Sequence, residues 1–196
     1  MKKEVQLKNK GVKSTDEICL IILRNEILRN RRIPDALQDL NSLENIDIIQ
    51  IKIMTPTREL IEAHYNKNEV WLKKVGEKTI DLLQANTRPI EHDALGYGQL
   101  ILESLINYNT EGPIMAIVLR GPDACAQLRA LVGDTNPELA QGGTMRAKYS
   151  NDSMRQAGLE VRAVRNAIHC SEDAFDGVTE TKLFFPEFNL NDLVAS

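Results

Sequence analysis

The sequence predicts an α/β fold: a ferredoxin-like α+β sandwich in which a four-stranded antiparallel sheet of βαββαβ order is covered by helices. Three observations predict it. Short apolar runs with the length and β-branching of strands recur along the chain. Segments with the apolar spacing of amphipathic helices separate them. Finally, 196 residues with 42% hydrophobic side chains suit one compact domain with a real core.

Two strands and two helices are expected in the first third of the chain. Residues 18–23 form a continuous apolar run rich in β-branched side chains, which is typical of a strand buried on both faces. Proline at position 34 is a favourable first helical residue and opens an amphipathic helix over residues 34–43. Residues 46–53 alternate as a second strand does, and Thr55 is expected to cap a helix over residues 58–66.

Residues 67–98 have the least regular pattern of the chain. Residues 71–83 have helical apolar spacing, although Gly76 weakens this prediction. Residues 86–98 are interrupted by one proline and two glycines and are expected to form a loop. A further helix is expected over residues 99–109.

The second half of the chain predicts two more strands and two more helices. Residues 114–119 form a third buried strand, and residues 124–132 form the helix that follows it. Periodicity mostly fails over residues 133–166, and loops of more than about 15 residues are usually functional or disordered. Residues 167–168 are a short apolar stretch for the fourth strand, and the last helix is expected over residues 173–185.

The charge of the chain limits its classes of partner. Lys and Arg total 24 against 28 Asp and Glu, which gives a formal charge of −4 and a pI near 5.5. This balance argues against binding of nucleic acid through bulk charge, whereas a few focused arginines suffice for a small anionic ligand. No apolar run approaches the roughly 20 residues of a membrane span, and the N-terminus has no secretory apolar segment, so a cytoplasmic protein is expected.

Residues 1–16 are a basic, polar segment ahead of the expected folded domain. They hold five lysines against Glu4 and Asp16, a local net charge of +3. A flexible solubilising tail and a segment that binds an acidic partner both fit this composition.

His169 is the first candidate for a catalytic residue, because the chain has only three histidines and this one follows an arginine-rich segment. Asn166 and Ser171 flank it, and such side chains orient an imidazole or bind a phosphate oxygen. Neutral imidazole is a competent nucleophile near pH 7. On these residues alone, a buried histidine that is simply satisfied by hydrogen bonds is the alternative.

Five blocks in the second half of the chain together resemble the nucleoside diphosphate kinases. In order, they are residues 112–121 (GPIMAIVLRG), 131–137 (LVGDTNP), 143–146 (GTMR), 165–171 (RNAIHCS) and 183–185 (LFF). The match covers the chain from about Tyr108 to Phe185. The resemblance implies a family domain over residues 17–196, in which residues 67–98 look like an insertion seen in longer members.

The resemblance implies ping-pong phosphoryl transfer through one histidine. His169 takes the γ-phosphate of a nucleoside triphosphate such as ATP and passes it to a different nucleoside diphosphate. Glu180 matches the acid that orients and polarises the histidine, and Ser171 belongs to the same hydrogen-bond network. Tyr65 matches an aromatic residue that supports the histidine.

The resemblance also implies a nucleotide site that works with Mg²⁺. Arg129, Thr135 and Arg146 match phosphate-binding positions, Asn166 matches the residue at the sugar hydroxyl, and Leu105 matches an apolar position near the base. No protein ligand of the metal is implied, since Mg²⁺ is held mainly by the nucleotide phosphates. The family further implies a homo-oligomer built from dimers, commonly a hexamer, with nucleoside tri- and diphosphates as partners.

The chain departs from the family pattern at the end of the first strand. The family has a lysine there that contacts the transferring phosphate, and alignment on residues 21–22 and 29–30 puts Leu23 in its place. Arg24 substitutes only if the strand ends early or bulges, because adjacent strand side chains face opposite sides. A slow kinase is therefore expected, in which Leu23→Lys raises turnover. The alternative is a nucleotide-binding regulatory or assembly module of the same fold with weakened catalysis.

Two other positions carry expectations. Cys170 stands beside the histidine where the family has a small residue, and a buried thiol there is more often inert than reactive. With Cys19 and Cys125 it has the spacing of neither a disulfide framework nor a zinc motif. Trp71 is the candidate for the aromatic residue that stacks on the base.

Overall fold

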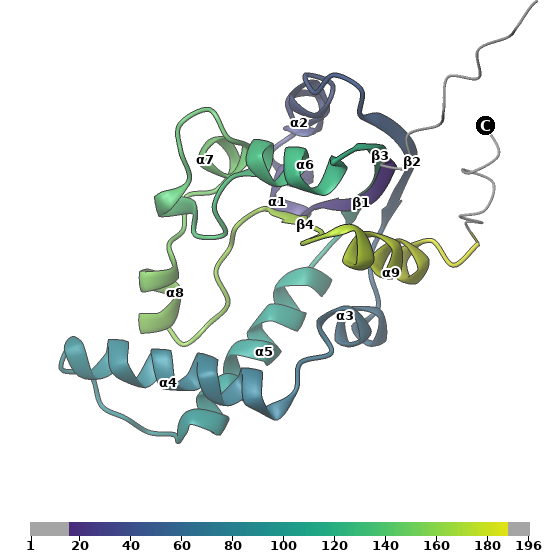
Figure 1. The fold of residues 1–196 in the computed structure, drawn as a ribbon. Coiled ribbons are helices and arrows are strands. Elements are labelled where there is room, and N and C mark those ends of the chain that lie inside the picture. Colours follow the sequence, from purple (N-terminus) through teal and green to yellow (C-terminus); the bar gives the residue numbers. More distant parts are fainter. Residues whose placement is uncertain (1–15, 188–196) are drawn as a thin grey trace, which may run out of the picture.

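The computed structural model describes residues 16–187 of the chain (Figure 1). Residues 1–15 of the predicted basic segment 1–16 lie outside the described residues, and its last residue, Asp16, belongs to the first strand. The strands are β1 (Asp16–Leu23), β2 (Asp47–Met54), β3 (Ile114–Pro122) and β4 (Ile168–Cys170). The helices are α1 (Asn25–Arg29), α2 (Ile33–Leu40), α3 (Arg58–Tyr65), α4 (Glu69–Ala85), α5 (Ala94–Thr110), α6 (Ala124–Val132), the 3₁₀ helix η1 (Pro137–Leu139), α7 (Met145–Tyr149), α8 (Met154–Leu159) and α9 (Ala174–Phe184).

The strands form one antiparallel sheet in the order β2-β3-β1-β4, which confirms the predicted fold class. The central strand β1 pairs with β3 along its whole length and with β4 at its C-terminal end. His169 of β4 lies opposite Ile22 of β1, so the two side chains face the same side of the sheet. The pairing of the short edge strand β4 with β1 therefore determines the position of His169 on the sheet.

Helices cover both faces of the sheet (Figure 1). On one face, α1, α2, α6 and α7 pack over alternate residues of β1 and β3, among them Ile21, Leu23 and Ile117. On the other face, α3, α5 and α9 pack over the remaining alternate residues of β1 and β3, among them Ile22 and Val118. Leu23 and Ile22 thus belong to opposite cores, as the alternation of a strand requires.

The predicted elements are confirmed to within a few residues, with four differences. The polar stretch after β1 contains the short helix α1, and the irregular stretch 133–166 contains α7 and α8. The cap of α3 is Thr57, whose side chain accepts a hydrogen bond from the amide of Leu60 at 3.2 Å, and is not Thr55. The segment expected to be a loop up to residue 98 ends earlier, because Asp93 caps α5 through the amide of Gly96 at 2.7 Å.

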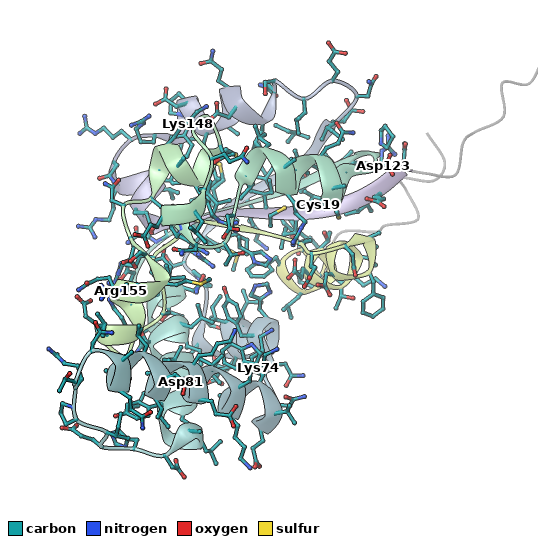
Figure 2. All side chains as sticks on the ribbon, turned by 60° about the vertical axis from the view of Figure 1, so that its left-hand side comes forward. Cys19, Lys74, Asp81, Asp123, Lys148 and Arg155 are labelled. Carbon is teal, nitrogen blue, oxygen red and sulfur yellow. The ribbon has the colours of Figure 1, made fainter. Side chains whose placement is uncertain are left out.

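Helices α4 and α5 form a closely packed pair beside the sheet. A Cβ atom on Gly76 would lie 1.7 Å from the carbonyl oxygen of Ala94, and one on Gly98 would lie 2.1 Å from that of Leu72. The glycines that weakened the helical prediction are therefore the residues that let the two backbones touch. In Figure 2, Lys74 marks α4 in the lower part of the molecule and Cys19 marks the sheet above it. Within residues 16–187, no helix has both the length and the apolar character to cross a membrane.

A third glycine brings α9 against β1. A Cβ atom on Gly177 would lie 1.8 Å from the carbonyl oxygen of Ile18, so only glycine permits this approach. Glu180 follows three residues later on the same helix, close to one turn away. The contact therefore fixes how far the Glu180 carboxylate extends toward β4.

Candidate active site

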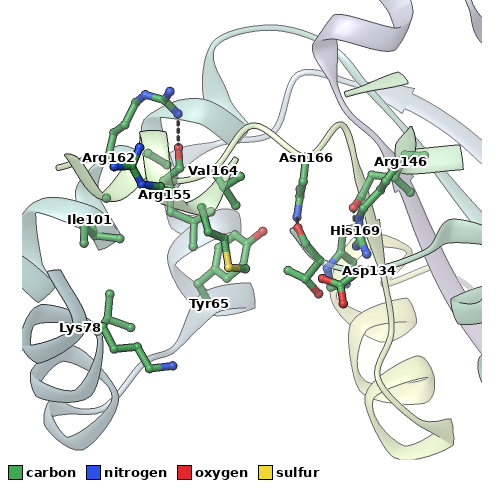
Figure 3. A pocket seen from close by; sticks show the side chains of 18 of the residues that line it. Tyr65, Lys78, Ile101, Asp134, Arg146, Arg155, Arg162, Val164, Asn166 and His169 are labelled. Atoms are coloured by element: carbon green, nitrogen blue, oxygen red, sulfur yellow. Dashed lines mark hydrogen bonds between the residues drawn. The ribbon is translucent and has the colours of Figure 1, made fainter. Parts of the chain in front are cut away.

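A cavity of about 750 Å³ lies between the end of β1, the helix pair α4–α5, α6, α8 and β4 (Figure 3). Eight of the ten site residues predicted from the sequence line it: Arg24, Tyr65, Leu105, Arg129, Thr135, Arg146, Asn166 and His169. The remaining two, Ser171 and Glu180, lie behind His169 and contact each other. The structure thus brings the predicted residues together, while their roles stay predictions.

His169 is held by one of its two ring nitrogens. Its Nε2 lies 2.9 and 3.0 Å from the two carboxylate oxygens of Glu180, and Ser171 Oγ donates to Glu180 at 2.6 Å. Burial alone raises the pKa of Glu180, but the hydrogen bonds and charges of His169 outweigh it and hold this pKa below its usual value. Glu180 is therefore an ionised acceptor, so in the neutral form of His169 the ring proton lies on Nε2 and Nδ1 has the lone pair.

His64 is the third member of this group and received no role from the sequence. Its side chain is 2% exposed, its Nδ1 lies 3.6 Å from Glu180 Oε1, and its ring packs edge-on against His169 with 4.6 Å between centroids. Neither ring nitrogen has a hydrogen-bond partner. Burial, and then the neighbouring His169, lowers the pKa of His64 to about 3. A rare histidine next to Tyr65 was the only sequence signal.

The depressed pKa of His64 predicts a loss of stability in mild acid. Because the folded pKa is below the unfolded value, the unfolded chain binds more protons, and the free energy of unfolding falls as pH falls below about 6.5. Between pH 7 and pH 5 the expected loss from this residue is about 2 kcal/mol. Urea unfolding at both pH values measures it. In His64→Asn this loss should shrink; an equal loss in the variant would assign it to other groups.

The end of β1 corrects the prediction for Leu23 and Arg24. Leu23 is fully buried in the core on the face of the sheet opposite to His169. The strand ends at Leu23, so Arg24 is free to turn its side chain into the cavity, and its amide donates to the carbonyl of Ala167 at 2.9 Å. Lysine at position 23 would place a charge in an apolar core. The expected gain of turnover in Leu23→Lys is therefore replaced by an expected loss of stability.

Arg24 is itself held by a hydrogen-bond network that the sequence did not reveal. The guanidinium donates to Asn109 Oδ1 at 3.0 Å, to Tyr65 Oη at 2.9 Å and to Asn166 Oδ1. It also lies over the ring of Tyr108, 4.9 Å from the centroid. Nothing in the sequence pointed to Asn109, because Asn109 and Arg24 meet only where α5 approaches the end of β1 in the folded chain. The network presents a fixed, permanently charged fork at the cavity wall.

Two further arginines bring positive charge to the cavity. Arg146 is 7% exposed and donates to the carbonyls of Gly133 and Ile168 at 2.6 and 2.9 Å, and its buried Nε has no partner. Burial, and then the nearby Arg24, lowers the pKa of Arg146 to about 10, so it stays charged at neutral pH. Arg129 lies exposed in the last turn of α6. Three cations around one histidine suit a ligand with several negative charges.

The far wall of the cavity is mostly apolar, although Lys78 and Thr79 also line it, and it comes largely from the irregular part of the sequence. Helix α4 contributes Trp71, Val75 and Leu82, and α5 contributes Leu105. A mostly apolar wall opposite a charged one is the arrangement of a site for an organic anion with a flat apolar part. Trp71 thus lines the same cavity as His169, as its candidate role requires.

The residues that line the cavity offer little to a bare Mg²⁺ ion. Asp134 is the one carboxylate among the residues that line it, and its Oδ1 already accepts from the amide of Asn136 at 2.7 Å. Mg²⁺ is usually held by one or two carboxylates together with substrate phosphates and water. The residues of the cavity therefore fit a Mg²⁺ ion that arrives on a nucleotide.

Cys170 lines the cavity beside His169, but its sulfur packs into the core. It is 8% exposed, belongs to the core that also contains Leu23, and its sulfur lies 3.6 Å from that of Cys19. All three cysteines are free thiols and buried, in line with the expected lack of a disulfide framework.

Comparison with known proteins identifies the family. The family model described as nucleoside diphosphate kinase matches residues 72–190. The chain belongs to the nucleoside diphosphate kinase family. A nucleoside diphosphate kinase from Pyrobaculum aerophilum is 34% identical over 147 residues, which cover 72% of this chain and 80% of that protein. One from Roseiflexus castenholzii is 34% identical over 125 residues, which cover 64% and 76%.

Solved structures of nucleoside diphosphate kinases share the fold. The chain superposes on the enzyme from Pyrobaculum aerophilum with a TM-score of 0.79 at 30% identity, covering 87% of this chain and 96% of that one. A second match, the enzyme from Borrelia burgdorferi with bound vanadate and ADP, has a TM-score of 0.69 at 21% identity and covers 90% and 89%. The chain is accordingly a phosphotransferase that binds nucleotides and transfers the γ-phosphate of a nucleoside triphosphate to a nucleoside diphosphate.

Proposed function

We propose that this nucleoside diphosphate kinase carries the phosphate on Nδ1 of His169. The observation that supports it is the contact of Glu180 with Nε2, because it leaves Nδ1 as the ring nitrogen with a lone pair. Nδ1 attacks the γ-phosphorus of a nucleoside triphosphate, the bond between this phosphorus and the β–γ bridging oxygen breaks, and the diphosphate leaves. Positive charge that develops on the imidazole is balanced by the Glu180 carboxylate.

The same geometry returns the phosphate to a second nucleotide. The terminal oxygen of another nucleoside diphosphate attacks the phosphorus in line, the bond to Nδ1 breaks, and His169 regains its neutral form. Arg24, Arg129 and Arg146 bind the phosphates and stabilise the charge of the transferring group. Mg²⁺ bound to the nucleotide neutralises further phosphate charge. Phosphoryl transfer asks the protein mainly for such positioning and charge.

The base and sugar would occupy the apolar half of the cavity. Trp71 and Leu105 offer a surface for the base, and Thr135 and Asn166 line the same cavity for contact with the phosphates and the sugar. Residues 67–98 then act as an inserted wall of the nucleotide site within one domain. This placement accounts for nucleotide binding by contacts that do not read the edge of the base.

A labelling experiment tests the phosphohistidine. The pure protein is incubated with γ-labelled ATP and Mg²⁺, and the label on the protein is tested for lability to acid and for release by an added nucleoside diphosphate. We expect an acid-labile label that the diphosphate removes as the triphosphate. Nucleotide binding without any label would instead support the alternative, a binding or regulatory module of the same fold.

We further propose that the chain forms a homo-oligomer through β2. This strand lies at the edge of the sheet, and Ile51 and Ile53 on one face of it are 44% and 59% exposed. An open edge with adjacent apolar side chains favours pairing with a second copy. Light scattering is expected to give a multiple of the chain mass, which Ile53→Asp lowers. An unchanged mass in the variant, or a monomeric parent, would exclude this interface.

A further inference from the structure

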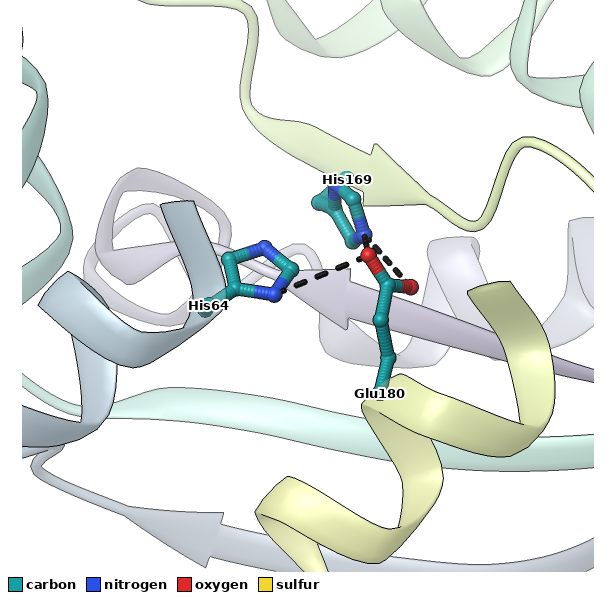
Figure 4. Close-up of side chains that lie close together, drawn as sticks. All are labelled: His64, His169 and Glu180. Atoms are coloured by element: carbon teal, nitrogen blue, oxygen red, sulfur yellow. Dashed lines mark hydrogen bonds and ion pairs between the residues drawn. The ribbon is translucent and has the colours of Figure 1, made fainter. Parts of the chain in front are cut away.

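His64, His169 and Glu180 place three metal-binding atoms at one point of the molecule (Figure 4). One nitrogen of each imidazole and one carboxylate oxygen all lie within 4.8 Å of one another. Within this group, Glu180 Oε1 is 2.9 Å from His169 Nε2 and 3.6 Å from His64 Nδ1. The residues come from three elements, α3, β4 and α9, so the fold and not a local motif assembles them.

The state of His64 indicates that this group can bind a ligand. A buried polar group without a partner costs free energy, and most buried polar side chains have one. The side chain of His64 is only 2% exposed. Both of its ring nitrogens lack a hydrogen bond, although Glu180 Oε1 lies 3.6 Å from Nδ1. The distance of 3.6 Å between His64 Nδ1 and Glu180 Oε1 is too long for a hydrogen bond. It suits two atoms that bind the same metal ion.

We propose that His64, His169 and Glu180 form a binding site for a divalent transition-metal ion of the zinc class. Two imidazoles and one carboxylate are a donor set that suits Zn²⁺. Mg²⁺ prefers oxygen ligands and octahedral geometry, so the Mg²⁺ that accompanies nucleotides does not compete for it. Ser171, which donates to the second oxygen of Glu180 at 2.6 Å, holds the carboxylate in place from outside the site.

Occupancy of this site switches off the nucleophile, a consequence that rests on the proposed function. Neutral imidazole has one proton for two nitrogens. In the metal-free protein Nε2 of His169 carries the ring proton and donates it in a hydrogen bond to Glu180. A metal ion bound at Nε2 takes the electron pair of this nitrogen, so the single ring proton of the neutral imidazole moves to Nδ1. Nδ1 then has no lone pair for the phosphorus. Metal binding and phosphorylation of the same histidine are therefore mutually exclusive, and zinc acts as a reversible inhibitor at the reacting residue itself.

Binding is tested without nucleotide, so that it does not depend on turnover. Co²⁺, which absorbs visible light when tetrahedrally bound to imidazole and carboxylate, is titrated into the protein and then displaced by Zn²⁺. We expect one ion per chain. Two single variants, His64→Asn and Glu180→Gln, are each expected to weaken binding of the ion by more than about tenfold. His92→Asn, which changes the exposed histidine outside the cavity, is the matched control and should bind as the parent does. No binding, or binding that survives both site variants, would overturn the proposal.

Inhibition is tested by labelling after the protein has received one equivalent of Zn²⁺ and free metal has been removed. The label from γ-labelled ATP is expected to fall by more than about tenfold in the parent and in His92→Asn, and to return when a zinc chelator is added. In His64→Asn, whatever labelling remains should be insensitive to zinc. Equal inhibition of His64→Asn would place the effect on the nucleotide and overturn the switch. A metal-free parent that takes no label refutes the phosphohistidine alone, because the Co²⁺ spectrum still reports the site.

Discussion

His169→Asn is expected to abolish the phosphorylated enzyme and to lower kcat/KM by about 10⁴-fold or more, since removal of a covalent nucleophile costs this much or more in comparable enzymes. Among the described neighbours, His64 does not line the cavity and both of its ring nitrogens are buried. Cys170 is directed into the core, and the Tyr65 hydroxyl is held by Arg24. Asparagine keeps a polar group beside Glu180 but has no nucleophilic nitrogen. Steady-state transfer from ATP to a second diphosphate, together with acid-labile labelling, measures the loss.

The control for this variant is His92→Asn, because His92 is exposed and contacts only the ring of Tyr97 among aromatic groups of residues 16–187. Its kcat/KM should equal that of the parent. Retention of acid-labile label in His169→Asn would mean that another residue carries the phosphate, and the role assigned to Glu180 would fall with it.

Continuous apolar runs were enough to predict that the two central strands are buried on both faces of the sheet. The runs at residues 18–23 and 114–119 are fully apolar, and both strands are buried on both faces. Helices α1, α7 and α8 were not predictable, because elements of five or six residues have almost no internal stability and depend on packing. The start of α5 was missed because a glycine that breaks an isolated helix is favourable where two helices touch.

The site was predictable where it depends on residues near His169 in the sequence and not where it depends on crossings of distant elements. The resemblance located Glu180 and Arg146, which the fold brings to the same histidine or its cavity. It did not find Asn109 or His64, since their roles follow from where α5 and α3 cross the sheet. The shift from Leu23 to Arg24 has the same origin: a pattern of alternation does not reveal at which residue a strand ends.

Arg24→Ala is expected to lower kcat by about 10²–10³-fold, the usual cost of removing one preorganised donor to a charged transition state. The guanidinium is fixed by Asn109, Tyr65 and Asn166 at the end of β1 and lines the same cavity as His169. Its charge is therefore available to the transferring phosphate without reorganisation. Arg24→Lys should recover part of the rate, because lysine restores the charge but not the planar fork that three partners hold.

Three measurements separate this role from a structural one. Thermal unfolding checks that Arg24→Ala is folded, since the partners left unpaired cost about 1–3 kcal/mol each. Fluorescence of Trp71, the one tryptophan of the chain and a residue of the cavity wall, reports nucleotide binding apart from turnover. Arg29→Ala on the exposed side of α1 is the matched control and should leave kcat unchanged. A folded Arg24→Ala protein with the kcat of the parent would show that this arginine only braces Asn166 and Tyr65, and that Arg129 and Arg146 supply the charge that the reaction needs.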